Sequence, residues 1–170
     1  MSSVPSRAVH TSTAETAMCD DGTARAASRA LHPSATGPEP GPTVLDTGVL
    51  EDIAGGLALA VDGTSEREPW QVRRTLLLAT EVYDAYLMEW GPASMSDTHD
   101  HDGSVGVVHV VSGSLIESSQ ALDSALPSPV RRLEAGQSTH VSAAQFHRLF
   151  NQTSGTTVTV NVFSPPIGEH

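Results

Sequence analysis

The pattern of hydrophobic and polar residues divides the chain near residue 42. Residues 1–42 contain no aromatic side chain, are rich in Ser, Thr, Ala, Gly and Pro, and end in the Gly- and Pro-rich run 37–42. Such a segment cannot bury enough apolar surface to offset its conformational entropy. We therefore predict a disordered tail over 1–42, in which Cys19 is an incidental exposed thiol, and a folded domain over 43–170.

A helical pattern opens the predicted domain. Apolar residues recur at helical spacing through the first part of 43–72, and Asp46 or Thr47 is the candidate N-cap. The pair Gly55 and Gly56 marks either a break in the helix or a point of close packing. The remainder of this N-terminal segment is expected to be a second short helical or extended piece.

The chain after this segment alternates short β-rich runs with turn residues. The runs lie at 75–79, 82–90, 105–111, 115–118, 130–133, 139–141 and 156–163. Many short strands without long intervening helices favour a β-sandwich or barrel of the jelly-roll type. The predicted fold class is therefore all-β, with a short helical N-terminal preface.

Composition narrows the classes of partner. Nine arginines, no lysine and 20 acidic residues give a formal net charge of −11, which repels phosphate backbones, so no nucleic-acid partner is expected. No stretch approaches the roughly 20 apolar residues of a membrane helix, and no secretory signal is evident near the N-terminus. A single cysteine excludes an internal disulfide and a Cys-based zinc site. We expect a cytoplasmic protein with no membrane partner.

Two segments carry candidate metal-binding residues. His99 and His101 are two positions apart, and side chains at that spacing on an extended strand point to the same side. Imidazole is the commonest side-chain ligand of divalent transition metals. His147 follows 46 residues after His101, and a late strand of an all-β chain can bring it beside the pair. Alternatively, His147 is a core histidine between Phe146 and Leu149.

These histidines and their neighbours resemble the cupin superfamily. Its first motif contains His-x-His followed by Glu and Gly, and its second motif ends in His, three residues and Asn. The histidine pair and Gly113 match the first motif, and His147 with Asn151 match the second. Gly106 stands where the glutamate belongs.

A three-histidine site without that glutamate is typical of thiol dioxygenases among cupins. Further features are similar to the cysteine dioxygenase family: Trp90-Gly91 before the histidine pair, Leu-Phe-Asn after Arg148, and the terminal Ser-Pro-Pro at 164–166. The resemblance covers roughly residues 70–167.

The resemblance implies a cupin-type jelly roll, that is, a double-stranded β-helix barrel, which binds one non-haem Fe(II) through His99, His101 and His147. The activity it implies is oxidation of a small-molecule thiol by molecular oxygen to a sulfinic acid. In the family, an arginine ahead of the histidine pair binds the substrate carboxylate. Arg74 is the candidate and Arg73 the alternative by one residue of register, unless both are surface arginines beside acidic residues.

The last predicted strand departs from the family pattern. The family usually has His-x-Tyr before Ser-Pro-Pro, whereas this chain has Asn161 and Phe163. Gly106 and Phe163 also exclude the Cys–Tyr cross-link of some members. We expect Asn161 and Phe163 to shape the substrate pocket and Gly106 to leave space beside Phe163, so the substrate is not expected to be free cysteine.

Two alternative functions stay open at this stage. One is a cupin oxygenase that acts on another small molecule, as in specialised metabolism, and the other is a cupin that binds a metal or ligand without turnover. Of the remaining polar residues, His109 is expected to point away from the metal, Asp100 and Asp102 to be solvated or turn-forming, and Arg131-Arg132 to be a solvated strand end.

Overall fold

The computed structural model describes residues 41–121 and 129–168. The predicted tail, including Cys19, therefore lies outside the described residues except for Gly41 and Pro42. The elements in chain order are α1 (Thr47–Ala58), β1 (Val72–Ala79), β2 (Asp84–Trp90), β3 (Val105–Ser112), β4 (Ser114–Ala121), β5 (Val130–Glu134), β6 (Ser138–Val141), β7 (Gln145–Phe150) and β8 (Thr157–Ser164).

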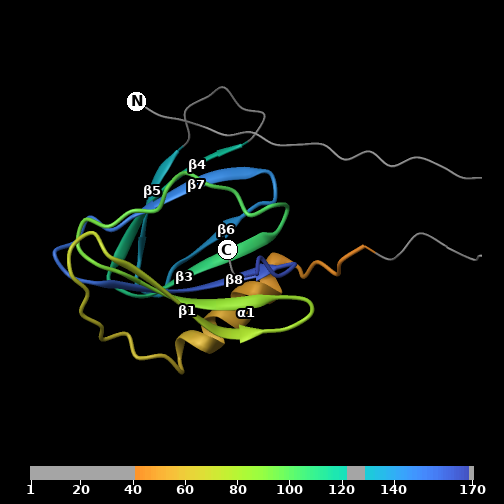
Figure 1. The fold of residues 1–170 in the computed structure, drawn as a ribbon, viewed down its shortest axis with the longest axis horizontal. Coiled ribbons are helices and arrows are strands. Elements are labelled where there is room, and N and C mark those ends of the chain that lie inside the picture. The colour runs from red at the N-terminus through yellow and green to blue at the C-terminus, as the bar shows by residue number, and fades with distance from the viewer. Residues whose placement is uncertain (1–40, 122–128, 169–170) are drawn as a thin grey trace, which may run out of the picture. The chain divides into compact units, whose positions relative to one another are not determined.

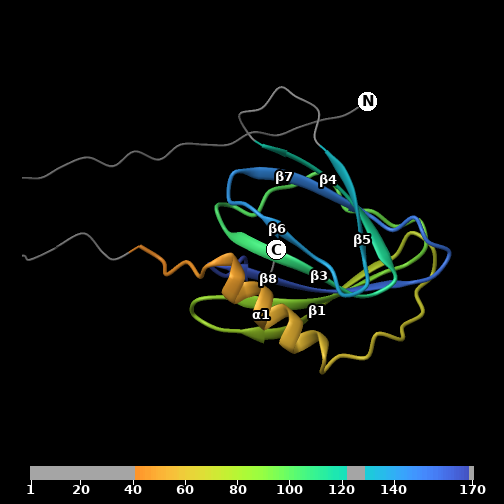
Figure 2. The same cartoon turned by 180° about the vertical axis from the view of Figure 1, so that it is seen from behind.

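The strands form two antiparallel sheets that face each other (Figures 1 and 2). The larger sheet has the order β1-β2-β8-β3-β6 and the smaller one the order β5-β4-β7. The last strand, β8, pairs with both β2 and β3 and so lies in the middle of the larger sheet. This arrangement confirms the predicted all-β jelly roll with a helical preface. Within the described ranges, no helix is long and apolar enough to cross a membrane.

Helix α1 begins at one of the two predicted N-caps, Asp46. The Asp46 side chain accepts a hydrogen bond of 2.8 Å from the backbone N–H of Gly48. The helix runs without interruption through Gly55 and Gly56 and ends at Ala58. A Cβ atom at either glycine would meet nothing within 4 Å, so this pair is neither a break nor a close packing point.

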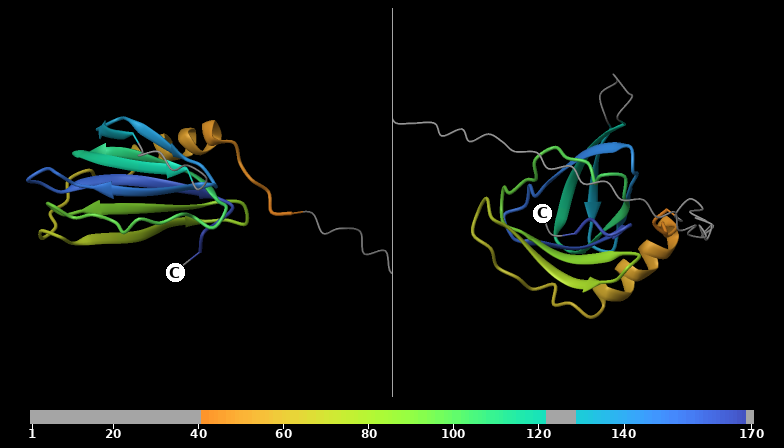
Figure 3. Two further views of the ribbon diagram at one scale, coloured as in Figure 1. Left: turned by 90° about the horizontal axis from the view of Figure 1, so that it is seen from above. Right: turned by 45° about the vertical axis from the view of Figure 1, so that its right-hand side comes forward.

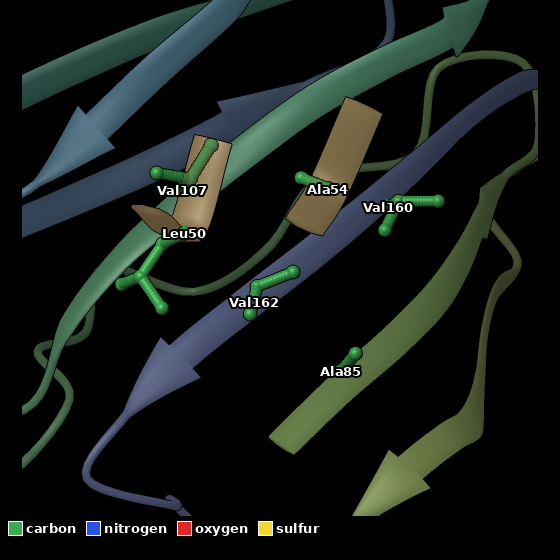
Figure 4. Packing of buried hydrophobic residues seen from close by; sticks show 6 residues of the cluster. All are labelled: Leu50, Ala54, Ala85, Val107, Val160 and Val162. Atoms are coloured by element: carbon green, nitrogen blue, oxygen red, sulfur yellow. The ribbon is translucent and has the colours of Figure 1, made fainter. Parts of the chain in front are cut away.

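The helix covers the outer face of the larger sheet (Figure 3). Leu50 and Ala54 of α1 are fully buried against side chains of β3 and β8, among them Val107, Val160 and Val162 (Figure 4). The amphipathic pattern that predicted the helix is thus explained by one apolar stripe that packs on a sheet.

The opposite face of the larger sheet looks into the space between the two sheets. A second buried apolar cluster fills part of this space and consists of Trp90, Val108, Leu115, Val141 and Leu149. Strand β8 is buried along its whole length. Because side chains alternate along a strand, its valines pack under the helix while Asn161 and Phe163 face the interior.

The sequence prediction missed one strand and shortened another. Strand β7 buries His147 and Leu149 and leaves Phe146 about 38% exposed. The polar His147 is thus more buried than the apolar Phe146 beside it. A hydrophobic pattern therefore could not identify this strand. Strand β1 begins at Val72 rather than at Thr75, so Arg73 and Arg74 belong to this strand.

The packing of α1 leads to a stability prediction. Replacing Leu50 with Ala removes a fully buried side chain and leaves a cavity between helix and sheet, so the free energy of unfolding should fall by about 2–5 kcal/mol. Val49 is the matched control, because it lies on the same helix turn and is 46% exposed. Val49→Ala should change the free energy by less than about 0.5 kcal/mol. Urea unfolding of the three proteins measures both values, and equal losses would contradict this packing.

Candidate metal centre

The backbone itself joins the two segments that carry the candidate histidines. His99 lies in the loop between β2 and β3, and His147 lies in β7. The N–H of His99 donates to the carbonyl of His147 at 3.1 Å, and the reverse bond is 2.9 Å. These two residues form an isolated antiparallel bridge. The expectation that His99 and His101 lie on a regular strand was wrong, because the loop pairs with β7 through two isolated bridges, at His99 and at Met95, and not along a continuous strand.

The three imidazole rings converge on one point. Their centroids are 4.9, 4.8 and 5.1 Å apart, and one nitrogen of each ring lies within 4.8 Å of the others. The Nε2 atoms of His101 and His147 are only 3.0 Å apart. The histidine set predicted from sequence is therefore brought together by the fold. Among the described residues, no carboxylate or thiol joins this group.

The partners of the rings fix which nitrogen faces the centre. His99 Nδ1 lies 2.8 Å from the carbonyl oxygen of Asp97, which can only accept, so this nitrogen carries the proton. His147 Nδ1 faces a carboxylate oxygen of Glu117 at 3.3 Å. In both rings the Nε2 lone pair is then left for a bond to a metal. Around metal-bound histidines, an outer carboxylate or carbonyl commonly accepts from the other ring nitrogen and fixes the tautomer in this way.

Burial keeps His101 in its neutral form. Desolvation, followed by the neighbouring His147 and His99, lowers the pKa of His101 to about 3. A neutral imidazole at physiological pH is the form that binds metals. Three imidazole nitrogens directed into one space fit a divalent transition-metal ion, which would bind all three lone pairs together.

Glu117 is the functional residue that sequence reasoning missed. It is fully buried on β4 and accepts hydrogen bonds from Arg131 Nε at 2.6 Å and Thr139 Oγ1 at 2.8 Å, besides its contact with His147. Burial would raise the pKa of this carboxyl, but its hydrogen-bonding partners outweigh burial and lower it. An acidic side chain inside a predicted strand was the available signal. Arg131 lies near the start of β5 with half of its side chain exposed, as expected of a solvated strand end, and its Nε also pairs with this buried carboxylate.

Asn151, which matches the second cupin motif, has a structural position. Its side-chain amide donates to the carbonyls of Trp90, Gly91 and Gly155 at 2.8–3.0 Å, and its own oxygen accepts from Thr153. It is fully buried and ties the end of β2 to the turn before β8. The asparagine thus fixes the strands around the histidines and is not itself part of the cluster.

A cavity of about 320 Å³ opens beside the three histidines. Its walls are mainly apolar and include Met88, Trp90, Met95, Leu149, Phe163 and Ile167. Its polar lining includes Arg74, Tyr86 and Asn161. An outer depression, lined in part by Pro42, Val44 and Asp100, adjoins it and shares Arg74, His99, His101 and Ile167 with it. An apolar pocket with a few convergent polar groups is the usual form of a small-molecule site.

The structure places the two candidate arginines on different faces of β1. Arg74 lines the cavity, and its guanidinium lies 4.3 Å above the Tyr86 ring and donates to the carbonyl of Gly168 at 3.0 Å. The guanidinium of Arg73 lies 3.8 Å from Glu89 and is largely exposed. Of the two, Arg74 is the one beside the histidines.

The segment that carries Gly168 is held against the cavity by a buried acid. Asp84 accepts hydrogen bonds from the backbone N–H groups of Ile167 and Gly168, both at 3.1 Å, and from the Tyr86 hydroxyl at 2.7 Å. It is 2% exposed. Ile167 is thereby fixed as a wall of the cavity, a role that sequence reasoning did not assign. The Ser164–Pro165 bond that leads into this segment is cis.

Phe163 forms the wall nearest to His101. The centroids of the two rings are 4.3 Å apart. Gly106 lies directly across from Phe163 in the sheet, and a Cβ atom there would overlap the phenyl ring. The expectation that Gly106 leaves free space was therefore wrong, because the Phe163 ring already occupies it.

The other polar residues considered from sequence lie outside the cluster. His109 bonds to Ser138 Oγ at 2.9 Å, and Asp100 and Asp102 are absent from the group of converging ligand atoms. These positions agree with their predicted roles.

Known structures share this fold at low sequence identity. A protein from Bacillus halodurans is 13% identical with a TM-score of 0.54, covering 76% of this chain and 87% of that chain. A cupin superfamily protein from Desulfitobacterium hafniense is 12% identical with a TM-score of 0.50, covering 64% and 86%. An oxalate oxidase structure is 19% identical with a TM-score of 0.52, covering 60% and 55%. At these identities, the likeness shows the cupin fold alone.

The sequence comparison identifies the family. No curated protein matches the sequence. The profile of the family described as cysteine dioxygenase type I matches residues 70–169, which include all three histidines, Arg74, Asn161 and Phe163. The chain therefore belongs to the cysteine dioxygenase type I family of cupins.

Proposed function

We propose that the protein is a mononuclear non-haem iron(II) enzyme that oxidises a small thiol other than free cysteine to a sulfinic acid. The observation that carries this proposal is the convergence of three imidazoles, with no acidic ligand among the described residues, beside a small apolar cavity. Both atoms of dioxygen enter the product, so the reaction RSH + O₂ → RSO₂H needs no external reductant. Bound Fe(II) would supply adjacent positions for the thiolate and dioxygen.

Each part of the site has a proposed role. His99, His101 and His147 hold the metal, and Arg74 holds an anionic group of the substrate, for which its fork of N–H donors is suited. Phe163 closes the cavity next to His101 with an apolar ring in place of a hydroxyl. We also propose a cytoplasmic location and, from the acidic composition, no nucleic-acid partner.

Two alternatives remain as outcomes of one experiment. The protein could oxidise a small molecule that is not a thiol, or bind a metal or ligand without turnover. An oxygen electrode with a panel of thiols and mass analysis of the products separates them. Sulfinate formation with oxygen uptake above that of free iron supports the proposal, and oxygen uptake without a thiol identifies an oxygenase of another substrate. A protein that binds iron but consumes no oxygen is a binding module.

The metal site can be tested by substitution. His99→Ala, His101→Ala and His147→Ala should each lower iron occupancy more than the roughly 10–100-fold loss of affinity that follows removal of an outer partner. His109→Ala is the control, because this ring bonds to Ser138 away from the cluster and should leave occupancy unchanged. Metal analysis after purification gives the result. Full occupancy in His147→Ala, or equal loss in His109→Ala, would contradict the assignment.

Glu117 should govern metal affinity without touching the metal. Glu117→Gln keeps the shape of the side chain but removes the charge that orients His147, so the dissociation constant for the metal should rise about 10–100-fold. Glu134→Gln is the matched control, since this half-exposed glutamate lies on the neighbouring strand β5. Competition with a chelator measures both constants. Unchanged affinity in Glu117→Gln would limit Glu117 to a structural role.

The altered pocket should discriminate against cysteine. The native protein is expected to oxidise cysteine with kcat/KM below about 10⁴ M⁻¹s⁻¹, the lower end of the ordinary enzyme range. The double variant Asn161→His with Phe163→Tyr adds a hydroxyl that can bond to a charged partner, a gain of about 1.5–3 kcal/mol. It should therefore improve kcat/KM for cysteine about tenfold or more. Steady-state kinetics on both proteins decide the matter, and efficient native turnover of cysteine would refute the prediction.

A further inference from the structure

A chain of hydrogen bonds fixes the orientation of Asn161. The indole N–H of Trp90 lies 3.1 Å from Thr159 Oγ1, and that oxygen lies 2.8 Å from Asn161 Oδ1. An indole nitrogen can only donate, so the Thr159 oxygen accepts a hydrogen bond from it. The Thr159 hydroxyl in turn donates a hydrogen bond to the Asn161 carbonyl oxygen. The reverse orientation of the amide would leave the buried hydroxyl of Thr159 without an acceptor, which is costly.

The fixed orientation turns the amide NH₂ group of Asn161 toward the cavity. Asn161 lines the cavity and is 6% exposed, and its side chain accepts a hydrogen bond from Thr159. Its carbonyl oxygen is directed at Thr159, away from the NH₂ group. Asn161 therefore presents its NH₂ donors, rather than its oxygen, to a bound molecule.

The surroundings of this donor are poorly suited to a cation. Met88, Trp90 and Phe163 contribute apolar surface around Asn161, and Arg74 adds a positive charge to the lining. Among the described residues that line the cavity, the only carboxylate is that of Asp97, which is exposed. A substrate ammonium would lose its hydration without gaining an acceptor at Asn161.

We infer that Asn161 is a specificity-determining donor that selects thiols bearing an uncharged carbonyl oxygen near the sulfur and disfavours thiols bearing an ammonium group there. This inference rests on the proposed binding of a thiol at the metal centre. It makes Thr159 a positioning residue, because Thr159 acts only through the orientation of Asn161. A neutral carbonyl fits the site since it accepts one hydrogen bond and needs no counter-charge in an apolar cavity.

The test compares two probes that differ in this one group, cysteamine and N-acetylcysteamine. Each is titrated without oxygen into the full-length protein loaded with cobalt(II), and the thiolate-to-cobalt absorption band reports binding. The quantity measured is the ratio of the two dissociation constants. Comparing this ratio between variants cancels the different acidities of the two thiols.

Asn161→Leu should lower the preference for N-acetylcysteamine about tenfold, because a typical hydrogen bond to a buried polar group has that effect on binding. Asn161→Asp replaces the donor with an acceptor and should move the preference further toward cysteamine. Thr159→Val frees the amide to rotate and should lower the preference while leaving Asn161 in place. Thr157→Val is the matched control on the same strand, outside the cavity lining, and should leave the ratio unchanged.

The outcomes separate this inference from the proposed function. If both thiols bind and the ratio stays the same in both Asn161 variants and in Thr159→Val, the inference is wrong and the thiol site remains. If neither thiol perturbs the cobalt spectrum of the native protein, the proposed function fails and the inference with it. Should an Asn161 variant fail to fold, as seen in its near-ultraviolet circular dichroism, Thr159→Val alone decides the question.

Discussion

The structure is organised around three imidazoles that share one small space. Two of their nitrogens, on His101 and His147, lie 3.0 Å apart, a separation that is unfavourable for two lone pairs unless a proton or a cation lies between them. Burial lowers the pKa of His101 to about 3, which removes protonation of that ring as a remedy at neutral pH. A divalent cation bound by all three rings would relieve this contact, and the surrounding polar groups hold the rings in place.

Holding these rings requires a polar network inside an otherwise apolar barrel. Glu117 is buried beside His147 and would be costly there alone, but Arg131 and Thr139 satisfy its carboxylate. The paired backbone hydrogen bonds between His99 and His147 set the distance between the loop and β7. The histidine cluster is therefore supported by backbone hydrogen bonds on one side and, on the other, by the buried Glu117 carboxylate with its partly exposed partner Arg131.

The substrate side of the cavity differs in character from the metal side. The larger sheet supplies it with Phe163, packed against Gly106, and with Asn161, whose carbonyl is held by Thr159. Neither side chain can ionise near neutral pH. The polar character of this part of the cavity therefore comes from the uncharged amide of Asn161 and from the guanidinium of Arg74, which lines the same space.

The sequence by itself determined the fold class, a helix cap at Asp46 or Thr47 and the candidate histidine set, because short apolar runs, capping residues and motif spacing are local signals. It could not show strand β7, since the backbone there buries His147 and exposes much of Phe146. Nor could it identify Glu117, whose role depends on residues from three other strands, or the filled space at Gly106. Those features depend on side chains distant in the chain, and only the register of the sheets decides which of them meet.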